Sequence, residues 1–103
     1  MTEVIELARF VVREGEEGPF LAKRGVMLSA VSRRFRGLRR LELVKLDDGS
    51  WIDIAVWENP ERRAEALRIA GEVPEIADWF AHIERDISNE FGTIYDRVDT
   101  AAS

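Results

Sequence analysis

The sequence predicts an α+β fold with one four-stranded antiparallel sheet and helices on one face. Two observations predict it. Stretches with strand and helix patterns follow one another as strand, helix, strand, strand, helix, helix, strand. The segment Asp47-Asp48-Gly49-Ser50 is typical of a hairpin turn between the second and third strands. The length of 103 residues suits a single domain, residues 1–103.

The first strand is predicted over residues 4–12, a largely apolar run that ends before Gly15. A helix is predicted over residues 19–35, because Pro19 favours a first helical turn and two preceding acids suit the positive end of the helix dipole. Its apolar face carries Phe20, Leu21, Met27, Leu28, Val31 and Phe35, and Arg24 projects from the middle of that face.

Strands are predicted over residues 38–46 and 51–58. With Asp48-Gly49 as a two-residue turn, Leu41 lies opposite Val56 and Leu43 opposite Ile54 on an apolar face. The other face is then mixed and is expected to meet a partner or a ligand. It carries Arg40, Glu42, Val44, Leu46, Trp51, Asp53, Ala55 and Trp57.

The second half of the chain is predicted to hold two helices and a strand. Asn59-Pro60 opens a helix over residues 60–70, and Pro74 opens another over residues 74–87. Residues 90–98 alternate as a last strand, and residues 99–103 form a frayed tail. This is the ferredoxin-like split β-α-β plan, in which one sheet face stays uncovered. A bare face bearing tryptophans predicts a homodimer formed through the sheet.

Composition excludes several classes of function. The chain has no cysteine and one histidine, so it offers no disulfide, thiolate site or multi-histidine metal site. No stretch approaches the length of a membrane helix, and the first residues lack a secretory pattern, so we expect a cytoplasmic protein without membrane contacts.

The charge is divided unevenly along the chain, although the net charge is −5. Five arginines crowd residues 33–40, and such a cluster can mark a nucleic-acid surface. An acidic chain repels phosphate overall, and cations are favoured at the carboxyl end of a helix. We therefore expect these arginines to end the first helix, and we expect no nucleic-acid partner.

Four local features resemble the antibiotic biosynthesis monooxygenase-like family of dimeric α+β barrels. They are residues 6–12 leading to Gly15, the helix opening Pro19-Phe20-Leu21, the strand end Val56-Trp57-Glu58-Asn59, and residues 74–80. The resemblance covers roughly residues 4–98. It implies a pair of subunits joined through their sheets, each with a small cavity between helices and sheet. Some members oxidise polycyclic phenols or quinols with dioxygen and without metal or flavin, and others degrade haem.

The residues depart from the haem-degrading branch of that family. Ala8 and Ala66 stand where that branch has an Asn and a Trp, and the segment around Asp78 stands where it has a haem-ligating His. His82 is close by, but helical spacing turns it away from the apolar stripe, between Asp78 and Asp86. We expect a solvated histidine, and no metal or other cofactor.

Arg24 and Glu6 are the candidate catalytic residues. Arg24 extends to the solvent at the edge of the helix, forms a buried structural ion pair, or donates hydrogen bonds to a substrate oxygen. The two-residue period of the first strand places Glu6 on the face of Phe10 and predicts that Glu6 is the partner of Arg24. Glu6 could act as a base only if burial raised its pKa, which tight pairing with Arg24 would oppose.

Six residues are candidates for binding a substrate: Phe10, Leu28, Trp57, Trp79, Phe80 and Tyr95. Trp57 and Trp79 could frame a flat aromatic molecule, and the Tyr95 phenol could donate to a substrate oxygen; ordinary packing contacts are the alternative. The sequence thus favours a cofactor-independent monooxygenase acting on a small aromatic or quinone-like molecule. The alternative is a non-catalytic ligand-binding or dimerisation module of the same fold.

Overall fold

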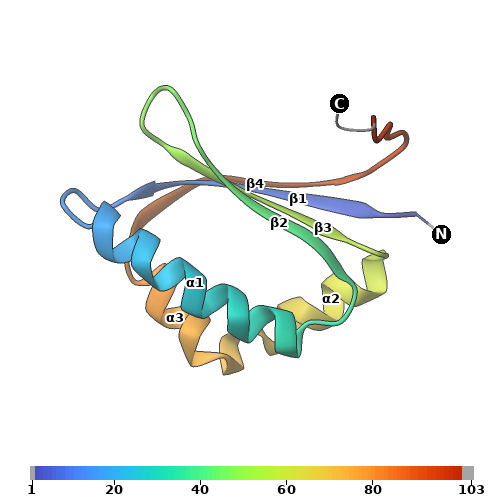
Figure 1. The fold of residues 1–103 in the computed structure, drawn as a ribbon, viewed down its shortest axis with the longest axis horizontal. Coiled ribbons are helices and arrows are strands. Elements are labelled where there is room, and N and C mark those ends of the chain that lie inside the picture. Colours follow the sequence, from blue (N-terminus) through green and yellow to red (C-terminus); the bar gives the residue numbers. More distant parts are fainter. Residues whose placement is uncertain (1, 101–103) are drawn as a thin grey trace.

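The computed structural model describes residues 2–100, which form an antiparallel sheet with helices packed on one face (Figure 1). The elements are β1 (Val4–Val12), α1 (Glu17–Arg34), β2 (Leu38–Lys45), β3 (Trp51–Trp57), α2 (Pro60–Ile69), the 3-10 turn η1 (Ala70–Glu72), α3 (Pro74–Phe80) and β4 (Ile83–Thr93). This arrangement confirms the predicted ferredoxin-like α+β fold. No helix within residues 2–100 is long and apolar enough to cross a membrane.

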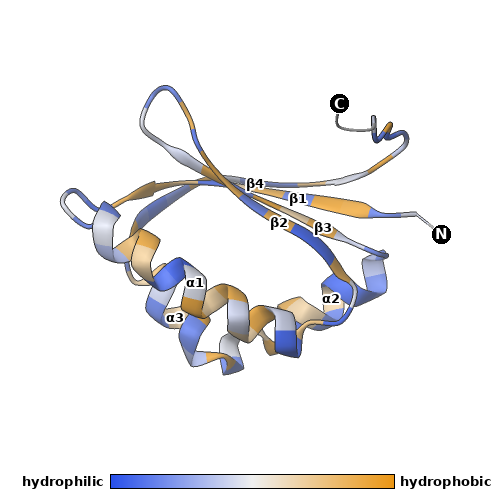
Figure 2. Ribbon diagram, viewed as in Figure 1, coloured by the Kyte–Doolittle hydropathy of each residue, from blue (hydrophilic) through white to orange (hydrophobic). Residues whose placement is uncertain are grey.

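The strand order in the sheet is β2-β3-β1-β4, with β1 paired to β3 on one side and to β4 on the other. Hydrophobic and hydrophilic residues both occur along the strands, as Figure 2 shows. Because successive side chains of a strand point to opposite faces of the sheet, every second side chain faces the helices. Phe10 lies on that inner face and packs against Phe20 of α1 and Trp79 of α3, with ring centroids 5.9 Å away in both cases. These aromatic contacts hold α1 and α3 onto the sheet.

The hairpin between β2 and β3 differs from the prediction by one residue. Its loop has three residues, 47–49: Leu46 N donates to the Ser50 carbonyl, and Gly49 has a φ of 89°. The carboxylate of Asp48 accepts hydrogen bonds from both the backbone N and the hydroxyl of Ser50, which fixes the longer loop.

A register shift of one residue exchanges the two faces of β3 relative to β2. Leu41 pairs with Ala55, and Leu43 pairs with Asp53, rather than with Val56 and Ile54 as predicted. The inner face consequently receives Trp51, Asp53, Ala55 and Trp57 from β3. The expectation of a bare sheet face bearing tryptophans was therefore wrong. The uncovered face instead carries Ile52 and Ile54 from β3, with charged residues such as Arg9 and Glu42 opposite them on the neighbouring strands.

The end of the chain also differs from the prediction. α3 stops at Phe80 rather than continuing to residue 87, and β4 spans Ile83–Thr93 rather than residues 90–98. The spacing of Ile83 and Ile87 fits either a helix or a strand. Residues 83–93 pair with the free edge of β1, which satisfies the backbone hydrogen-bonding groups of both segments and favours a strand. Asp99 and Thr100 have no regular structure, and the rest of the predicted frayed tail, residues 101–103, lies outside the described residues.

Candidate functional site

A cavity of about 360 Å³ lies between the inner sheet face and the helices. Helices α1, α2 and α3 supply apolar walls, and strands β1, β3 and β4 supply its polar groups. The polar lining residues are Glu6, Asp53, Asp86, Ser88 and Asn89. A mostly apolar pocket with a few polar groups on one wall is typical of a small-molecule site.

The side chains of Leu67, Phe80 and Ile87 line the cavity and are also exposed to solvent. They come from α2, the end of α3 and β4. These three residues mark where the cavity opens to solvent, and they make the opening apolar.

Glu6 projects into this cavity from the middle of β1. Burial raises the pKa of the Glu6 carboxyl above its ordinary value, and the like charge of Asp53 acts in the same direction. Asn89, Arg63 and Trp57 favour the ionised form and oppose the shift, but burial is the largest effect. The carboxyl forms no ion pair with any residue of the described range 2–100. It can therefore accept a proton from a bound molecule.

The predicted pairing of Glu6 with Arg24 was wrong. Arg24 instead makes two hydrogen bonds to the Asp53 carboxylate, of 2.8 and 3.1 Å. The shifted hairpin register explains the change, because it turns Asp53 from the predicted outer face to the face below α1. The guanidinium of Arg24 also lies 4.9 Å from the Trp79 ring centroid. Arg24 therefore already has a carboxylate partner.

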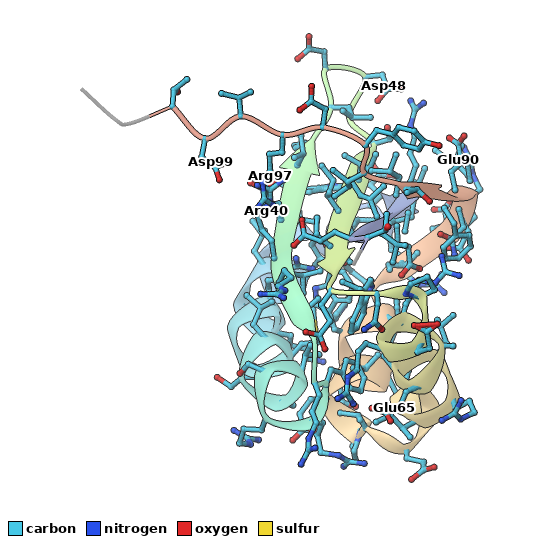
Figure 3. The ribbon with its side chains drawn as sticks, turned by 90° about the vertical axis from the view of Figure 1, so that its right-hand side faces the viewer. Arg40, Asp48, Glu65, Glu90, Arg97 and Asp99 are labelled. Carbon is cyan, nitrogen blue, oxygen red and sulfur yellow. The ribbon has the colours of Figure 1, made fainter. Side chains whose placement is uncertain are left out.

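Four of the six candidate binding residues line the cavity: Phe10, Trp57, Trp79 and Phe80. Leu28 does not; it lines a separate groove between α1 and β2 and packs against the core. Tyr95 follows the end of β4, and its side chain is 95% exposed. The segment beyond β4, which carries Arg97 and Asp99, runs away from the helices (Figure 3). The structure thus separates Leu28 and Tyr95 from the other four.

Two indole donors of the cavity wall have no partner. Trp57 Nε1 and Trp79 Nε1 are both buried and donate no hydrogen bond to the described part of the chain. A buried donor without an acceptor is energetically costly, and such groups are few in folded proteins. The Trp57 indole lies near the Glu6 carboxyl and favours its ionised form, which leaves Trp79 Nε1 as the donor for a ligand oxygen.

His82 was predicted to lie on a helix. It lies instead in the turn between α3 and β4. Its side chain is 13% exposed, and Nδ1 lies 2.7 Å from Glu16 Oε1. The prediction of a solvated histidine flanked by Asp78 and Asp86 was therefore wrong, because it assumed that α3 continued past Phe80. His82 is not among the residues that line the cavity.

Asp53 and Asn89 line the cavity but were not predicted to do so. Asp53 had been assigned to the outer face by the two-residue turn. Asn89 lies opposite Ala8 in the pairing of β1 with β4, but it fell between the predicted helix, which ended at residue 87, and the predicted strand, which began at residue 90. The Asp48–Ser50 turn motif was the signal that could have corrected the first error.

The fold and the cavity place the chain in the class of ferredoxin-like α+β proteins that enclose a small pocket between sheet and helices. No protein-family model and no curated protein sequence matches the chain. Solved structures do match it over nearly its full length, and they include antibiotic biosynthesis monooxygenase-like proteins, as the local sequence features indicated.

Three of these structures illustrate the likeness. SnoaB, a cofactor-independent oxygenase from Streptomyces nogalater, is 25% identical, with a TM-score of 0.70 over 96% of this chain and 97% of SnoaB. A Bordetella bronchiseptica protein provisionally named an antibiotic biosynthesis monooxygenase is 15% identical, with a TM-score of 0.74 over 95% and 100% of the two chains. A dimeric ferredoxin-like protein from an uncultured marine organism is 13% identical, with a TM-score of 0.72 over 98% and 95%.

Proposed function

We propose that this protein is a monooxygenase that needs no cofactor and acts on a small hydroxyaromatic or quinol-like molecule bound in the cavity. The observation that carries the proposal is Glu6, a half-buried carboxyl of raised pKa in a mostly apolar cavity, with no cation bonded to it. The likeness to SnoaB, a cofactor-independent oxygenase, supports the same reaction class.

Glu6 acts as the general base in this reaction. A carboxyl of raised pKa is a stronger base than an ordinary one, so it can take the acidic proton of a phenol or of a CH₂ group beside a carbonyl. Trp79 Nε1 donates a hydrogen bond to the oxygen on which negative charge develops. The apolar walls exclude water from the resulting carbanion.

The carbanion then reduces dioxygen and bonds to it, which gives a peroxide on the substrate carbon. Cleavage of the O–O bond, with loss of the second hydrogen of the CH₂ group, leaves one oxygen as a carbonyl and releases the other as water. The substrate supplies all four electrons, so CH₂ and O₂ become C=O and H₂O. The role of the protein is limited to proton transfer, charge stabilisation and exclusion of water.

Oxygen uptake with 1,8-dihydroxyanthrone as the probe tests this proposal. We expect the wild-type protein to consume one O₂ per quinone formed, faster than the spontaneous oxidation, and Glu6→Gln to lower the rate by about 100-fold. Glu14→Gln is the matched control, because Glu14 is exposed in the turn before α1. Binding of the probe without faster oxygen uptake would instead favour the non-catalytic ligand-binding alternative.

We also propose that two copies pair through the uncovered sheet face. That face presents Ile5, Leu7, Ile52 and Ile54, which lie on the side opposite the helices and are only partly exposed. An apolar sheet face of this kind is typical of an interface. The dimeric ferredoxin-like neighbour supports the same arrangement. Light scattering after size-exclusion chromatography should give twice the chain mass of 11.8 kDa, and a monomer at micromolar concentration would refute the pairing.

A further inference from the structure

Arg63 differs from the other arginines near the cavity because it has no carboxylate partner within residues 2–100. Arg24 is paired with Asp53, and Arg62 is paired with Glu58 and Glu65. The Nε atom of Arg63 is buried and donates no hydrogen bond to any described group. A guanidinium has a fixed fork of donors, and burying one of them without an acceptor costs free energy.

The position of Arg63 relates this unused donor to the cavity. Arg63 lies one helical turn before Ala66 and Leu67 on α2, and both of these residues line the cavity. Its guanidinium carbon lies 4.3 Å from the ring centroid of Phe91 on β4. Phe91 is paired with Glu6 across the β1–β4 register and shares its face of the sheet. Arg63 therefore bridges α2 and β4 beside the cavity, next to the lining residues Ala66 and Leu67 rather than among them.

Arg63 lies near Glu6 through Phe91, without a bond between the two charged groups. The positive charge of Arg63 lowers the pKa of Glu6, yet no ion pair joins the two side chains. The Phe91 ring orients the guanidinium plane and covers one of its faces. The guanidinium edge is thus left with hydrogen-bond donors for an additional acceptor.

We propose that Arg63 binds a carboxylate of the substrate, so that the molecule in the cavity is an aromatic acid rather than a neutral aromatic compound. Planar carboxylates match the donor fork of a guanidinium. Glu6 and Asp86 line the cavity without a cationic partner in residues 2–100, so they disfavour an anion beside them. The substrate carboxylate therefore lies at the α2–β4 side and the ring occupies the apolar interior. This inference rests on the proposed function only in taking the cavity as the substrate site.

Binding of two naphthalene probes tests the inference without any need for turnover. Calorimetric titrations under nitrogen would compare 2-naphthoate with the neutral 2-naphthalenemethanol at pH 7.5. We expect the wild-type protein to bind the carboxylate about tenfold more tightly, the range of a charge-assisted hydrogen bond. Arg63→Gln should bind the two probes equally. Arg68→Gln, at an exposed arginine of the same helix, should keep the wild-type preference.

Arg63→Lys is a second variant that still tests the inference if Arg63→Gln does not fold, because lysine keeps the charge and the aliphatic stem. It should keep part of the preference, since an ammonium cannot form the planar fork. Two results would overturn the role of Arg63 and leave the proposed function intact. One is equal binding of both probes by the wild-type protein, and the other is a preference for the carboxylate that persists in Arg63→Gln. Failure of both probes to bind would overturn this inference and also the use of the cavity as a substrate site.

Discussion

Arg24 and Asp53 form a doubly hydrogen-bonded ion pair between α1 and β3, with the side chains only 9% and 18% exposed. The pair offsets the cost of burying a guanidinium beneath the helix. It also explains why a charged residue stands in the middle of an otherwise apolar helix face. Its role in the fold is therefore to join α1 to the sheet.

Asp53→Asn should destabilise the protein by about 3 kcal/mol, because it leaves the buried Arg24 charge without a counter-charge. Urea unfolding would measure the change. The double variant Arg24→Met/Asp53→Leu should lose less stability than Asp53→Asn alone, since it removes both charges. A double variant that is less stable than Asp53→Asn would contradict this account.

Arg24→Met also separates a structural role from a functional one. We expect a less stable protein whose affinity for 2-naphthoate is unchanged, because the donors of Arg24 are already bound to Asp53. The titration should be run well below the unfolding temperature of the variant. A large loss of affinity in folded protein would instead show that Arg24 contacts the ligand.

The raised pKa of Glu6 predicts a pH-dependent cost to stability. Because the folded state binds the proton more tightly than the unfolded chain, stability falls as the pH rises from the ordinary value of 4.5 through the raised pKa. Glu6→Gln removes this cost. The variant should melt at a higher temperature than wild type at pH 7.5 and at nearly the same temperature at pH 4.

The same pKa determines the pH dependence of the reaction. The oxidation rate should rise with pH through the raised pKa of Glu6, because only the carboxylate can accept the substrate proton. Initial rates of oxygen uptake between pH 4 and 8 would show the rise. Glu14→Gln should keep the profile of the wild-type protein, and a flat profile in the wild type would exclude Glu6 as the base.

Gly37 is a site where a single methyl group should disturb the fold. Its φ is 80°, and a Cβ there would lie 2.6 Å from Cγ of Arg62 and 3.1 Å from Cγ of Glu58. Gly37→Ala should cost about 1–3 kcal/mol, from backbone strain and from displacement of the Arg62–Glu58 pair. Gly18→Ala is the control, because a Cβ at Gly18 meets no atom within 4 Å. Thermal unfolding of the two variants should differ clearly.

If the dimer forms through the uncovered sheet face, a charged residue at position 54 should weaken it. Ile54→Asp places a carboxylate on the uncovered sheet face and should shift the protein towards the monomer, because burying an unpaired charge in an interface is costly. Val26→Asp makes the same chemical change on the outer side of α1, where Val26 is 59% exposed, and should leave the mass unchanged. Light scattering measures both variants. Equal masses for all three proteins would count against this interface.

The sequence pattern was sufficient to predict the element order, because each element has a local signal. Pro60 and Pro74 open α2 and α3 as expected, and Asn59 accepts a hydrogen bond from Arg62 N at the start of α2. The register of β3 and the end of α3 were predicted wrongly, for different reasons. The register depends on a three-residue loop fixed by Asp48, a local signal that a two-residue turn does not take into account. The end of α3 depends on pairing of β4 with the β1 edge, a long-range contact that local signals do not show.

These two errors account for the changes at the candidate site. Arg24 and Glu6 were both located on the helix-facing side correctly, but their partners were not. The register placed Asp53 below Arg24, and β4 brought Asn89 and Phe91 beside Glu6. The alternation of side chains along one strand determines which face of the sheet each residue lies on. Its neighbours on that face depend on the register of strands that are far away in the sequence.

Ala8 provides a steric test of the cavity that leaves its polar groups in place. It lines the cavity between Glu6 and Phe10 on β1, so Ala8→Leu fills part of the 360 Å³ with a side chain that strands tolerate. We expect weaker binding of both naphthalene probes, by at least tenfold, with unchanged or higher stability because apolar surface is buried. Leu7→Ile, at the adjacent position on the opposite face, is the control and should bind as wild type. Wild-type affinity in Ala8→Leu would show that ligands bind elsewhere on the protein.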